Sequence, residues 1–176
     1  KERLGGIIGA VSEHLTFDVG YQTALEIALG ASSQHIIVED EQAATKAIDF
    51  LKRHKAGRAT FLPLTTIKAR TISSQNQATI AASSGFLGMA DDLVAFDKRL
   101  EAIFKNLLAS TAIFDSVENA RAAARQVRYQ VRIVTLDGTE LRTGGSYAGG
   151  ANRQNNSIFI KPELEQLQKE IAEEEA

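Results

Sequence analysis

Residues 21–38 read YQTALEIALGASSQHIIV and predict the unit from which the fold is built. Apolar side chains recur every three or four positions over residues 21–29, which is typical of one face of a helix. Gly30 is placed to end this helix, because glycine readily adopts the left-handed conformation of a helix C-terminus. The apolar run over residues 35–38 then predicts a short buried strand, so the chain is expected to alternate helices and strands.

The helix–strand unit continues and then recurs. Asp40 is expected to cap a second helix that stops at Gly57, and residues 59–62 form the next strand before Pro63. A second series follows, with a helix over 100–108, a strand over 112–114, a helix that starts at a capping box of Asp115 and Glu118 and runs to Gln126, a strand over 131–134 and a hairpin turn at Asp137 and Gly138.

This recurrence predicts an α+β fold of two related mixed α/β lobes. Ala43 and Ala120, for example, occupy matching places in the two series at a separation of 77 positions. We place lobe one at about residues 5–84 and lobe two at about residues 85–160. The stretch 71–84 is rich in Ser, Gln, Asn and Thr, which is typical of a connection between such units.

The end of the chain is expected to begin a coiled-coil arm. Pro162 suits the first position of a helix. Apolar residues then recur at spacings of three and four, as core positions of a coiled coil do, at Leu164, Leu167 and Ile171. Because the chain does not begin with methionine and this helix looks cut, we expect a piece of a longer protein. A frayed acidic tail is the alternative for residues 161–176.

Composition and charge set further limits. The chain has 176 residues, 44% of them hydrophobic and 24% charged, which is ordinary for a globular domain. Cysteine is absent, which excludes disulfides and thiolate metal sites, and no apolar run is long enough to span a bilayer. The net charge is −2, but residues 161–176 contribute six glutamates against two lysines. The remaining body is therefore slightly basic.

The residues that could carry catalysis are few. His14, His35 and His54 stand apart from one another, without metal-ligand spacing, and we interpret His35 as a structural residue beside its strand. Asp91 and Asp92 are adjacent, so on a helix their carboxylates diverge, and we interpret them as a solvated helix start. The chain contains neither a P-loop nor a dinucleotide-binding fingerprint.

The segment GGSYAGG at residues 144–150 is unusual, since it holds four of the chain's 13 glycines. Three interpretations stay open. It is a flexible linker, a loop whose backbone N–H groups bind phosphate, or an edge strand whose backbone closely approaches a second chain. The third interpretation makes it a dimer interface, whose candidate residues are Gly144, Gly145, Ser146, Tyr147, Gly149 and Gly150.

Two groups of cations are free of intervening acids. The first contains Lys52, Arg53, Lys55, Arg58, Lys68 and Arg70. The second contains Arg121, Arg125, Arg128 and Arg132, which are spaced for one helical face as far as the helix lasts. Phosphate contact needs cations but no base-reading pattern. Both groups are therefore candidate DNA-binding surfaces, and solvated helix faces are the alternative.

Several motifs together resemble the hinge domain of a bacterial SMC (structural maintenance of chromosomes) protein. The resemblance covers nearly the whole chain, about residues 4–160. The motifs that carry it are ALEIALG at residues 24–30, GRATFLPL at 57–64, GFLGMADDLV at 85–94, VTLDG at 134–138 and GGSYAGG at 144–150.

The resemblance implies a hinge domain over residues 5–160 that is inserted in a long antiparallel coiled coil, with residues 1–4 as the stub of the incoming arm and residues 161–176 as the start of the outgoing one. Hinges of this family form homodimers in which strand edges meet at the glycine loops. The fragment itself is expected to be non-catalytic and to need no cofactor, since ATP and Mg belong to the absent head domain, where kleisin-type subunits also bind. The expected location is the cytoplasm, on the nucleoid, with no membrane contact.

The resemblance also implies weak, sequence-independent DNA binding. Family members often carry lysines after the second glycine pair, whereas only Arg153 is charged over residues 151–156 here. Arg153 is therefore the first DNA-binding candidate, followed by Lys52, Arg53, Lys55 and Arg58. The alternative function is a small nucleotide-binding α/β enzyme that uses the glycine loop for phosphates.

Overall fold

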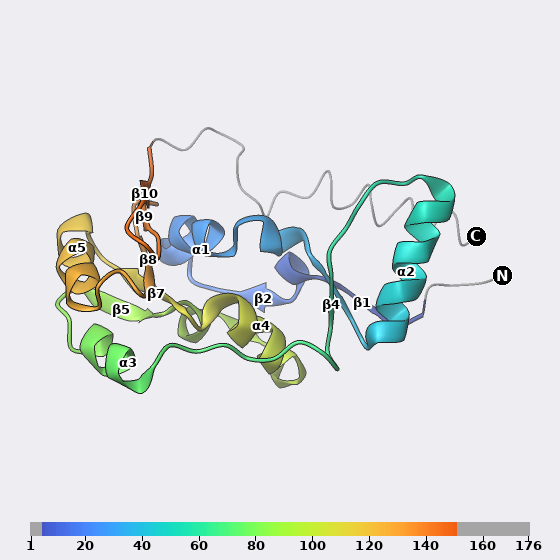
Figure 1. The fold of residues 1–176 in the computed structure, drawn as a ribbon, viewed down its shortest axis with the longest axis horizontal. Helices are drawn as coiled ribbons and strands as arrows, with labels where there is room; N and C mark the ends of the chain where they lie inside the picture. Colours follow the sequence, from blue (N-terminus) through green and yellow to red (C-terminus); the bar gives the residue numbers. More distant parts are fainter. Residues whose placement is uncertain (1–4, 151–176) are drawn as a thin grey trace.

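The computed structural model describes residues 5–150, which form a mixed α/β body with a sheet toward each end and two helices between them (Figure 1). The helices are α1 Gln22–Leu29, α2 Glu41–His54, α3 Ser74–Ala81, α4 Glu101–Leu108 and α5 Val117–Gln126. The strands are β1 Ile7–Ala10, β2 Leu15–Thr16, β3 Ile36–Val38, β4 Phe61–Pro63, β5 Phe86–Met89, β6 Ala95–Phe96, β7 Thr111–Phe114, β8 Arg132–Thr135, β9 Glu140–Leu141 and β10 Tyr147–Ala148.

The element order of the first half recurs in the second. Lobe one runs β1-β2-α1-β3-α2-β4, and lobe two runs β5-β6-α4-β7-α5-β8 before it adds β9 and β10. In each lobe a glycine at strongly positive φ, Gly9 or Gly88, lies beside a register shift in the first strand. The two related lobes expected from the sequence are thus present in the order of the elements.

The number of positions that separates equivalent residues of the two lobes is not constant and differs from the expected 77. Gly9 and Gly88 lie 79 positions apart, but the N-caps Asp40 and Ser116 lie only 76 apart. The connection between α1 and β3, residues 30–35, accounts for the change because its counterpart between α4 and β7 is only residues 109–110. Ala120 therefore matches Ala44, and its pairing with Ala43 was wrong by one residue.

The sheets differ in size. In lobe one the strand order is β1-β3-β4, with β1 antiparallel and β4 parallel to β3. In lobe two the order is β10-β9-β8-β7-β5, with the same pairings of β5 and β8 on β7. A third, two-stranded sheet pairs β2 with β6 across the lobes, so that Thr16 lies opposite Ala95. These two residues are also 79 positions apart, so a pseudo-two-fold axis passes between them.

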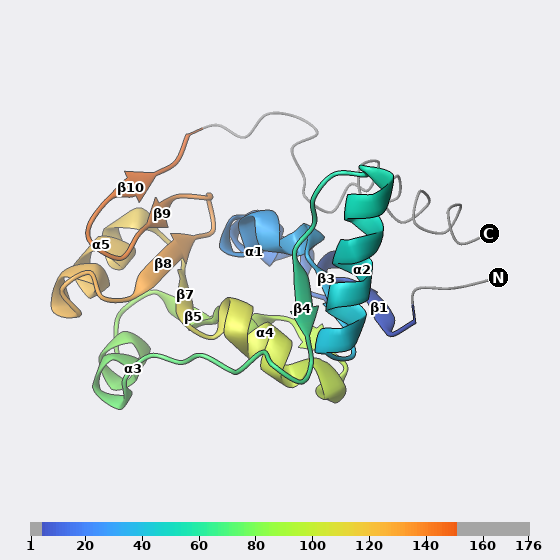
Figure 2. The same cartoon turned by 45° about the vertical axis from the view of Figure 1, so that its right-hand side comes forward.

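One apolar core joins the lobes. Its buried side chains come from α1 and β3 of lobe one and from α4 and β7 of lobe two. Leu25 and Phe104 occupy equivalent positions on α1 and α4, and both are fully buried in this core. A second cluster lies under α5 in lobe two, and Ile80 of α3 packs into it. Figure 2 shows α1 and α4 between the two outer sheets.

Some local expectations are corrected. Lys55 at φ 48°, not Gly57, ends α2. Ser116 caps α5 by accepting a hydrogen bond from the Asn119 N–H, so the cap is not Asp115. The connection 71–84 contains α3.

Asp91 is not part of a solvated helix start. Its side chain is only 5% exposed, and the Lys105 ammonium donates to its carboxylate at 2.8 Å. Within residues 5–150 no helix has the length and apolar character to cross a membrane. The expected arms, residues 1–4 and 161–176, lie outside the described residues.

Candidate functional site

The glycine-rich segment forms the outer edge of the larger sheet. Its strand β10 pairs antiparallel with β9, with Tyr147 opposite Leu141, and no other strand of the described chain pairs beyond it. Gly144 and Gly145 have φ angles of 93° and 105° and form the turn between β9 and β10. The structure therefore favours an ordered edge strand over a flexible linker.

This edge offers backbone hydrogen-bonding groups to a partner. The Arg142 N–H donates to the Ser146 carbonyl at 2.8 Å, so this pair is hydrogen-bonded across the ladder. Because hydrogen-bonded and non-hydrogen-bonded pairs alternate in an antiparallel ladder, the N–H and C=O of Tyr147 point away from β9. A Cβ added at Gly144, Gly145 or Gly150 would meet no atom within 4 Å. The β10 edge thus has unobstructed space at these glycines and no side chains there to keep a second backbone away.

The same segment is poorly suited to hold a phosphate. The Gly144 N–H donates to the Tyr129 carbonyl at 3.0 Å, and the Gly145 N–H donates to the Arg142 carbonyl at 3.0 Å. A phosphate-binding loop needs successive N–H groups that are free to face the anion. The interpretation as a nucleotide loop is therefore disfavoured by the hydrogen bonds of the turn.

Lobe one has an open edge of its own at β4. The Ile36 N–H donates to Thr60 and the Leu64 N–H donates to Val38, both at 2.9 Å, so alternate residues of β4 face β3. Phe61 lies between them, and its backbone groups point outward. Pro63 also faces outward, where its missing N–H removes no bond of the sheet, as is usual for proline on an edge strand.

The first group of cations lies beside this β4 edge. Lys52 and Arg53 belong to the last turn of α2, Lys55 ends the helix, and Arg58 precedes β4 by three residues. All four side chains are exposed. The ion pair of Arg53 with Asp49 is long, at 4.0 Å, and is itself exposed. The structure thus brings four of the predicted DNA-binding residues together on one connection.

The second group of cations is divided by the fold. Arg121, Arg125 and Arg128 are exposed along and just beyond α5. Arg132 lies instead in β8, and its side chain points inward between the lobes. Arg132 belongs to the strand predicted over residues 131–134, and its inward side chain separates it from the exposed cations of α5, so it is not part of a DNA-binding surface.

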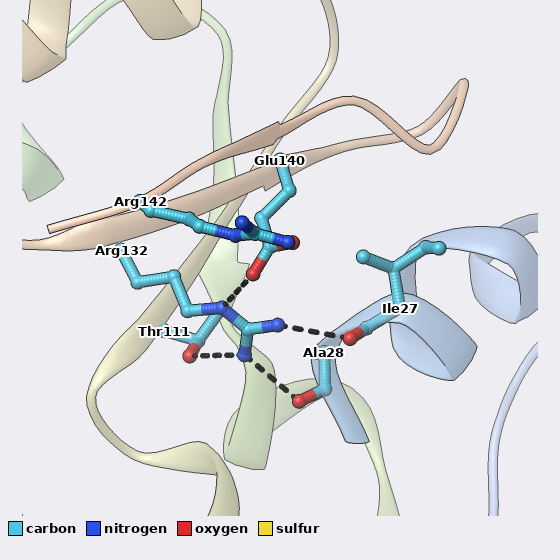
Figure 3. Close-up of polar contacts among 6 residues, drawn as sticks. All are labelled: Ile27, Ala28, Thr111, Arg132, Glu140 and Arg142. Carbon is cyan, nitrogen blue, oxygen red and sulfur yellow. Dashed lines mark hydrogen bonds and ion pairs between the residues drawn. The ribbon is translucent and has the colours of Figure 1, made fainter. Parts of the chain in front are cut away.

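Arg132 joins lobe two to the end of α1 (Figure 3). Its guanidinium donates to the carbonyls of Ile27 and Ala28 at 2.9 and 2.8 Å and to the Glu140 carboxylate at 2.6 Å. Carbonyls in the last turn of a helix lack partners within the helix, so Arg132 acts as a cap supplied from the other lobe. Arg142 donates to the second Glu140 oxygen at 3.2 Å. The sequence carries no local signal for the contact with α1, because Ile27 and Ala28 are more than 100 residues away from Arg132.

A pocket of about 280 Å³ opens between α1 and the β9–β10 hairpin. It is lined by Ile27, Gly138, Glu140, Arg142, Ala148, Gly149 and Gly150. Among residues 5–150 no group of three or more histidine, aspartate or glutamate side chains could hold a metal ion.

His35 precedes β3 as a half-buried residue whose pKa is lowered by burial. Arg153, the first DNA-binding candidate, lies outside the described residues.

Comparison with known proteins gives consistent matches. The family model described as "SMC proteins Flexible Hinge Domain" matches residues 4–124. "Chromosome partition protein Smc" from Bacillus subtilis (strain 168) is 46% identical and covers 99% of the chain, and the Lactiplantibacillus plantarum protein of the same name is 38% identical and covers 92%. The chain spans only 15% and 14% of the length of these two relatives.

Solved structures agree with the sequence relatives. An asymmetric dimer of the Geobacillus stearothermophilus SMC hinge domain matches with a TM-score of 0.83 and 39% identity, covering 97% of this chain and 69% of that one. The Pyrococcus furiosus SMC hinge domain matches with a TM-score of 0.69 and 34% identity, covering 87% of this chain and 81% of that one.

Proposed function

The chain belongs to the SMC flexible hinge domain family, and we propose that it joins two coiled-coil arms of a chromosome partition protein by pairing with a second copy of itself. Relatives of the chain are named for chromosome partition, and one related hinge was solved as a dimer. In this proposal the hinge is non-catalytic, and the ATPase heads and any kleisin-type subunits act at the far end of the arms. The protein would work in the cytoplasm, on the nucleoid.

The observation that carries the dimer proposal is the complementarity of the two sheet edges. Within residues 5–150, β4 ends the sheet of lobe one without a further strand, whereas its equivalent β8 is covered by β9 and then β10. Phe61 on β4 and Tyr147 on β10 both present outward backbone groups. We propose that β10 of one protomer pairs with β4 of the other. A two-fold axis repeats this contact, so two such pairings close a ring.

The dimer proposal is tested by filling the open edge. Gly144, Gly145, Gly149 and Gly150 replaced together by glutamate should give a folded monomer, because added carbons and charge block backbone approach. Light scattering after gel filtration measures the mass, and circular dichroism checks the fold. The matched control is Gly20→Glu, since Gly20 also has no atom within 4 Å of an added Cβ and belongs to the short 3-10 helix Val19–Tyr21, not to an edge strand.

A single substitution avoids the risk that four changes at once unfold the hairpin. Tyr147→Pro removes an outward N–H without removing a bond to β9, so the protomer should fold while the dimer weakens. If both the quadruple variant and Tyr147→Pro remain dimers at the wild-type concentration, the interface lies elsewhere.

We further propose that the hinge binds DNA weakly and without sequence preference. The support is the exposed cation cluster at the end of α2, formed by Lys52, Arg53, Lys55 and Arg58, together with Arg153 by its place in the family pattern. Cations of this kind contact phosphates, and such binding falls with salt at a log–log slope of about −0.9 per phosphate on duplex DNA. Arg153→Glu and the double variant Lys52→Glu/Arg58→Glu should weaken binding to every sequence alike and flatten this slope. An unchanged slope in both variants would place the contact on other residues.

A further inference from the structure

Two tyrosines form an aromatic pair at the end of α5, in which Tyr147 is exposed and Tyr129 is half-buried against the second apolar cluster. Tyr147 of β10 is 45% exposed, and its ring lies 6.2 Å from that of Tyr129, measured between centroids. Their hydroxyls are joined by a hydrogen bond of 2.7 Å. An exposed tyrosine has no packing role on the side that faces solvent, so the open faces of this pair are available to a ligand.

The backbone that presents Tyr129 is strained. Arg128 and Tyr129 both have φ of 55°, a region that side chains other than glycine's rarely occupy. The turn is held by two hydrogen bonds, from the Tyr129 N–H to the Ala124 carbonyl at 2.8 Å and from the Gly144 N–H to the Tyr129 carbonyl at 3.0 Å. Consecutive bulky residues in this region concentrate at binding sites, where the strain serves to position a side chain. Here it positions Tyr129 against Tyr147.

Exposed arginines lie on α5 and just beyond it, next to Tyr129 in the chain. The hydrogen bond with Tyr129 raises the pKa of Tyr147, and the nearby positive charge of Arg121 acts in the opposite direction. Arg125 and Arg128 are exposed on the same end of α5. Between Glu118 and Asp137 the chain has no acidic residue. An aromatic surface edged by cations is the arrangement that binds unpaired nucleotides, because bases stack on the rings and phosphates contact the cations.

We propose that Tyr129 and Tyr147, with Arg121 and Arg128 beside them, form a base-stacking site for single-stranded DNA. The inference rests on the proposed DNA-binding function and assigns it a second contact, distinct from the cations at the end of α2. Base pairs in a duplex keep their faces stacked on one another, so duplex DNA meets only the arginines of this site. The site is compatible with the proposed dimer, because the backbone of Tyr147 faces the sheet edge while its ring lies against Tyr129.

Tyrosine fluorescence tests the proposal directly, because the chain has three tyrosines and no tryptophan. Tyr21→Phe removes the background signal and serves as the parent protein. Titration of this protein with an oligothymidine should quench the fluorescence of the pair to saturation, whereas a duplex of equal length should leave most of it. No quenching at a concentration where anisotropy shows bound oligothymidine overturns the proposal.

A set of variants separates stacking from charge. Tyr129→Leu/Tyr147→Leu should lower affinity for oligothymidine by roughly five- to a hundredfold at an unchanged salt slope, with duplex affinity within about twofold. Tyr129→Phe/Tyr147→Phe keeps the rings and should retain binding, which controls for the lost hydroxyls. Equal losses for both forms of DNA, or conversion of the leucine variant to a monomer by light scattering, would show a structural role and overturn the proposal.

The two proposals fail in different ways. If the wild type binds duplex and oligothymidine equally and the leucine variant changes neither, the stacking site is wrong and phosphate binding stands. If the wild type binds neither at low salt, DNA binding fails as a whole, and the stacking site fails with it.

Discussion

Lobe one and lobe two share an element order, but their sheets end differently. In lobe one the parallel pair β3–β4 ends the sheet, and no described strand pairs with the outer edge of β4. In lobe two the equivalent pair β7–β8 is extended by the β9–β10 hairpin, whose last strand is rich in glycine. Two identical lobes would present two identical edges. The added hairpin makes the ends of the molecule different, and so allows them to be complementary.

The lobes also differ in the polar contacts that they make with each other. Arg132 begins β8 and reaches across to α1, whereas the equivalent residue of lobe one is Thr60, just before β4, whose side chain is too short to do so. The link between the lobes is therefore asymmetric in its polar contacts and symmetric in its apolar core.

The largest effect is expected in the shared core. Phe104→Ala should lower the free energy of unfolding by about 3–5 kcal/mol, because it opens a cavity in the cluster that both lobes line. Leu25→Ala at the equivalent position of α1 should cost about 2–5 kcal/mol. Urea unfolding followed by circular dichroism measures both. A second transition in either variant would mean that the lobes unfold separately and would break the comparison.

The next largest effect on stability is expected at Arg132, which forms the polar link between the lobes. Arg132→Met should cost about 2–4 kcal/mol, because it leaves Glu140 partly buried without its closest partner and removes the cap of α1. Arg53→Met is the matched control, since its ion pair is exposed, and it should change stability by less than about 0.5 kcal/mol. Equal effects of the two substitutions in thermal unfolding would show that Arg132 is not a link between the lobes.

Replacement by alanine should lower the free energy of unfolding by similar amounts at glycines in equivalent positions of the two lobes, and by less at glycines of the β10 edge. Gly6 and Gly85 have φ of 81° and 83°, and an added Cβ would lie 2.8 Å from Ala43 Cβ or 2.3 Å from the Asp115 carboxylate. Gly6→Ala and Gly85→Ala should each cost about 1–3 kcal/mol. Gly144→Ala meets no neighbouring atom, so only its positive φ counts, at about 1 kcal/mol. A larger loss at Gly144 than at Gly85 in chemical denaturation would contradict this ranking.

The smallest effect concerns acid titration in lobe two. Burial, and then the charge of Asp91, raise the pKa of Asp92. The folded protein therefore holds this proton more tightly than the unfolded chain does, so stability falls as pH rises from the ordinary aspartate pKa through the raised folded value. Asp92→Asn removes this loss and should be slightly more stable than the wild type at neutral pH.

Asp137 provides the control of opposite sign. A hydrogen bond from the Thr135 hydroxyl lowers the pKa of Asp137. Its contribution to stability is complete above the ordinary aspartate pKa and is lost as pH falls through the lowered folded value. Asp137→Asn should therefore destabilise the neutral protein. The same direction of change in both variants, measured by urea unfolding at neutral and acidic pH, would contradict the assignment.

The sequence predicted the elements whose cause is local. Periodicity located α1 and α4, Asp40 caps α2 as expected, and Gly138 turns the β8–β9 hairpin. The capping residue of α5 was missed by one position because Asp115 and Ser116 are both good caps, and only the backbone geometry distinguishes them. The α3 helix was missed because its polar composition resembles a linker, and a single buried residue, Ile80, anchors it.

The residues of the candidate sites likewise divide into those that the local sequence predicts and those that depend on distant partners. The edge strand and the cations around α2 were predictable from glycine density and from charge along the chain. The roles of Arg132 and Asp91 were not, because each depends on a partner brought close by the fold: the carbonyls of α1 for Arg132 and Lys105 for Asp91. The pairing of Tyr129 with Tyr147 depends in the same way on the β9–β10 hairpin, which folds back to the end of α5.

The β2–β6 seam has a consequence for how such a chain originates and how it can be divided. Because Thr16 meets Ala95 at equivalent positions, a half-length ancestor would have formed the same seam between two separate copies, and a tandem gene fusion would have preserved it. In the present domain the two lobes still share one apolar core. If the peptide were cut between β4 and α3, each fragment would expose a complementary apolar face and one strand of the seam. The domain is thus a natural candidate for fragment complementation, in which two separately expressed halves recover one native fold.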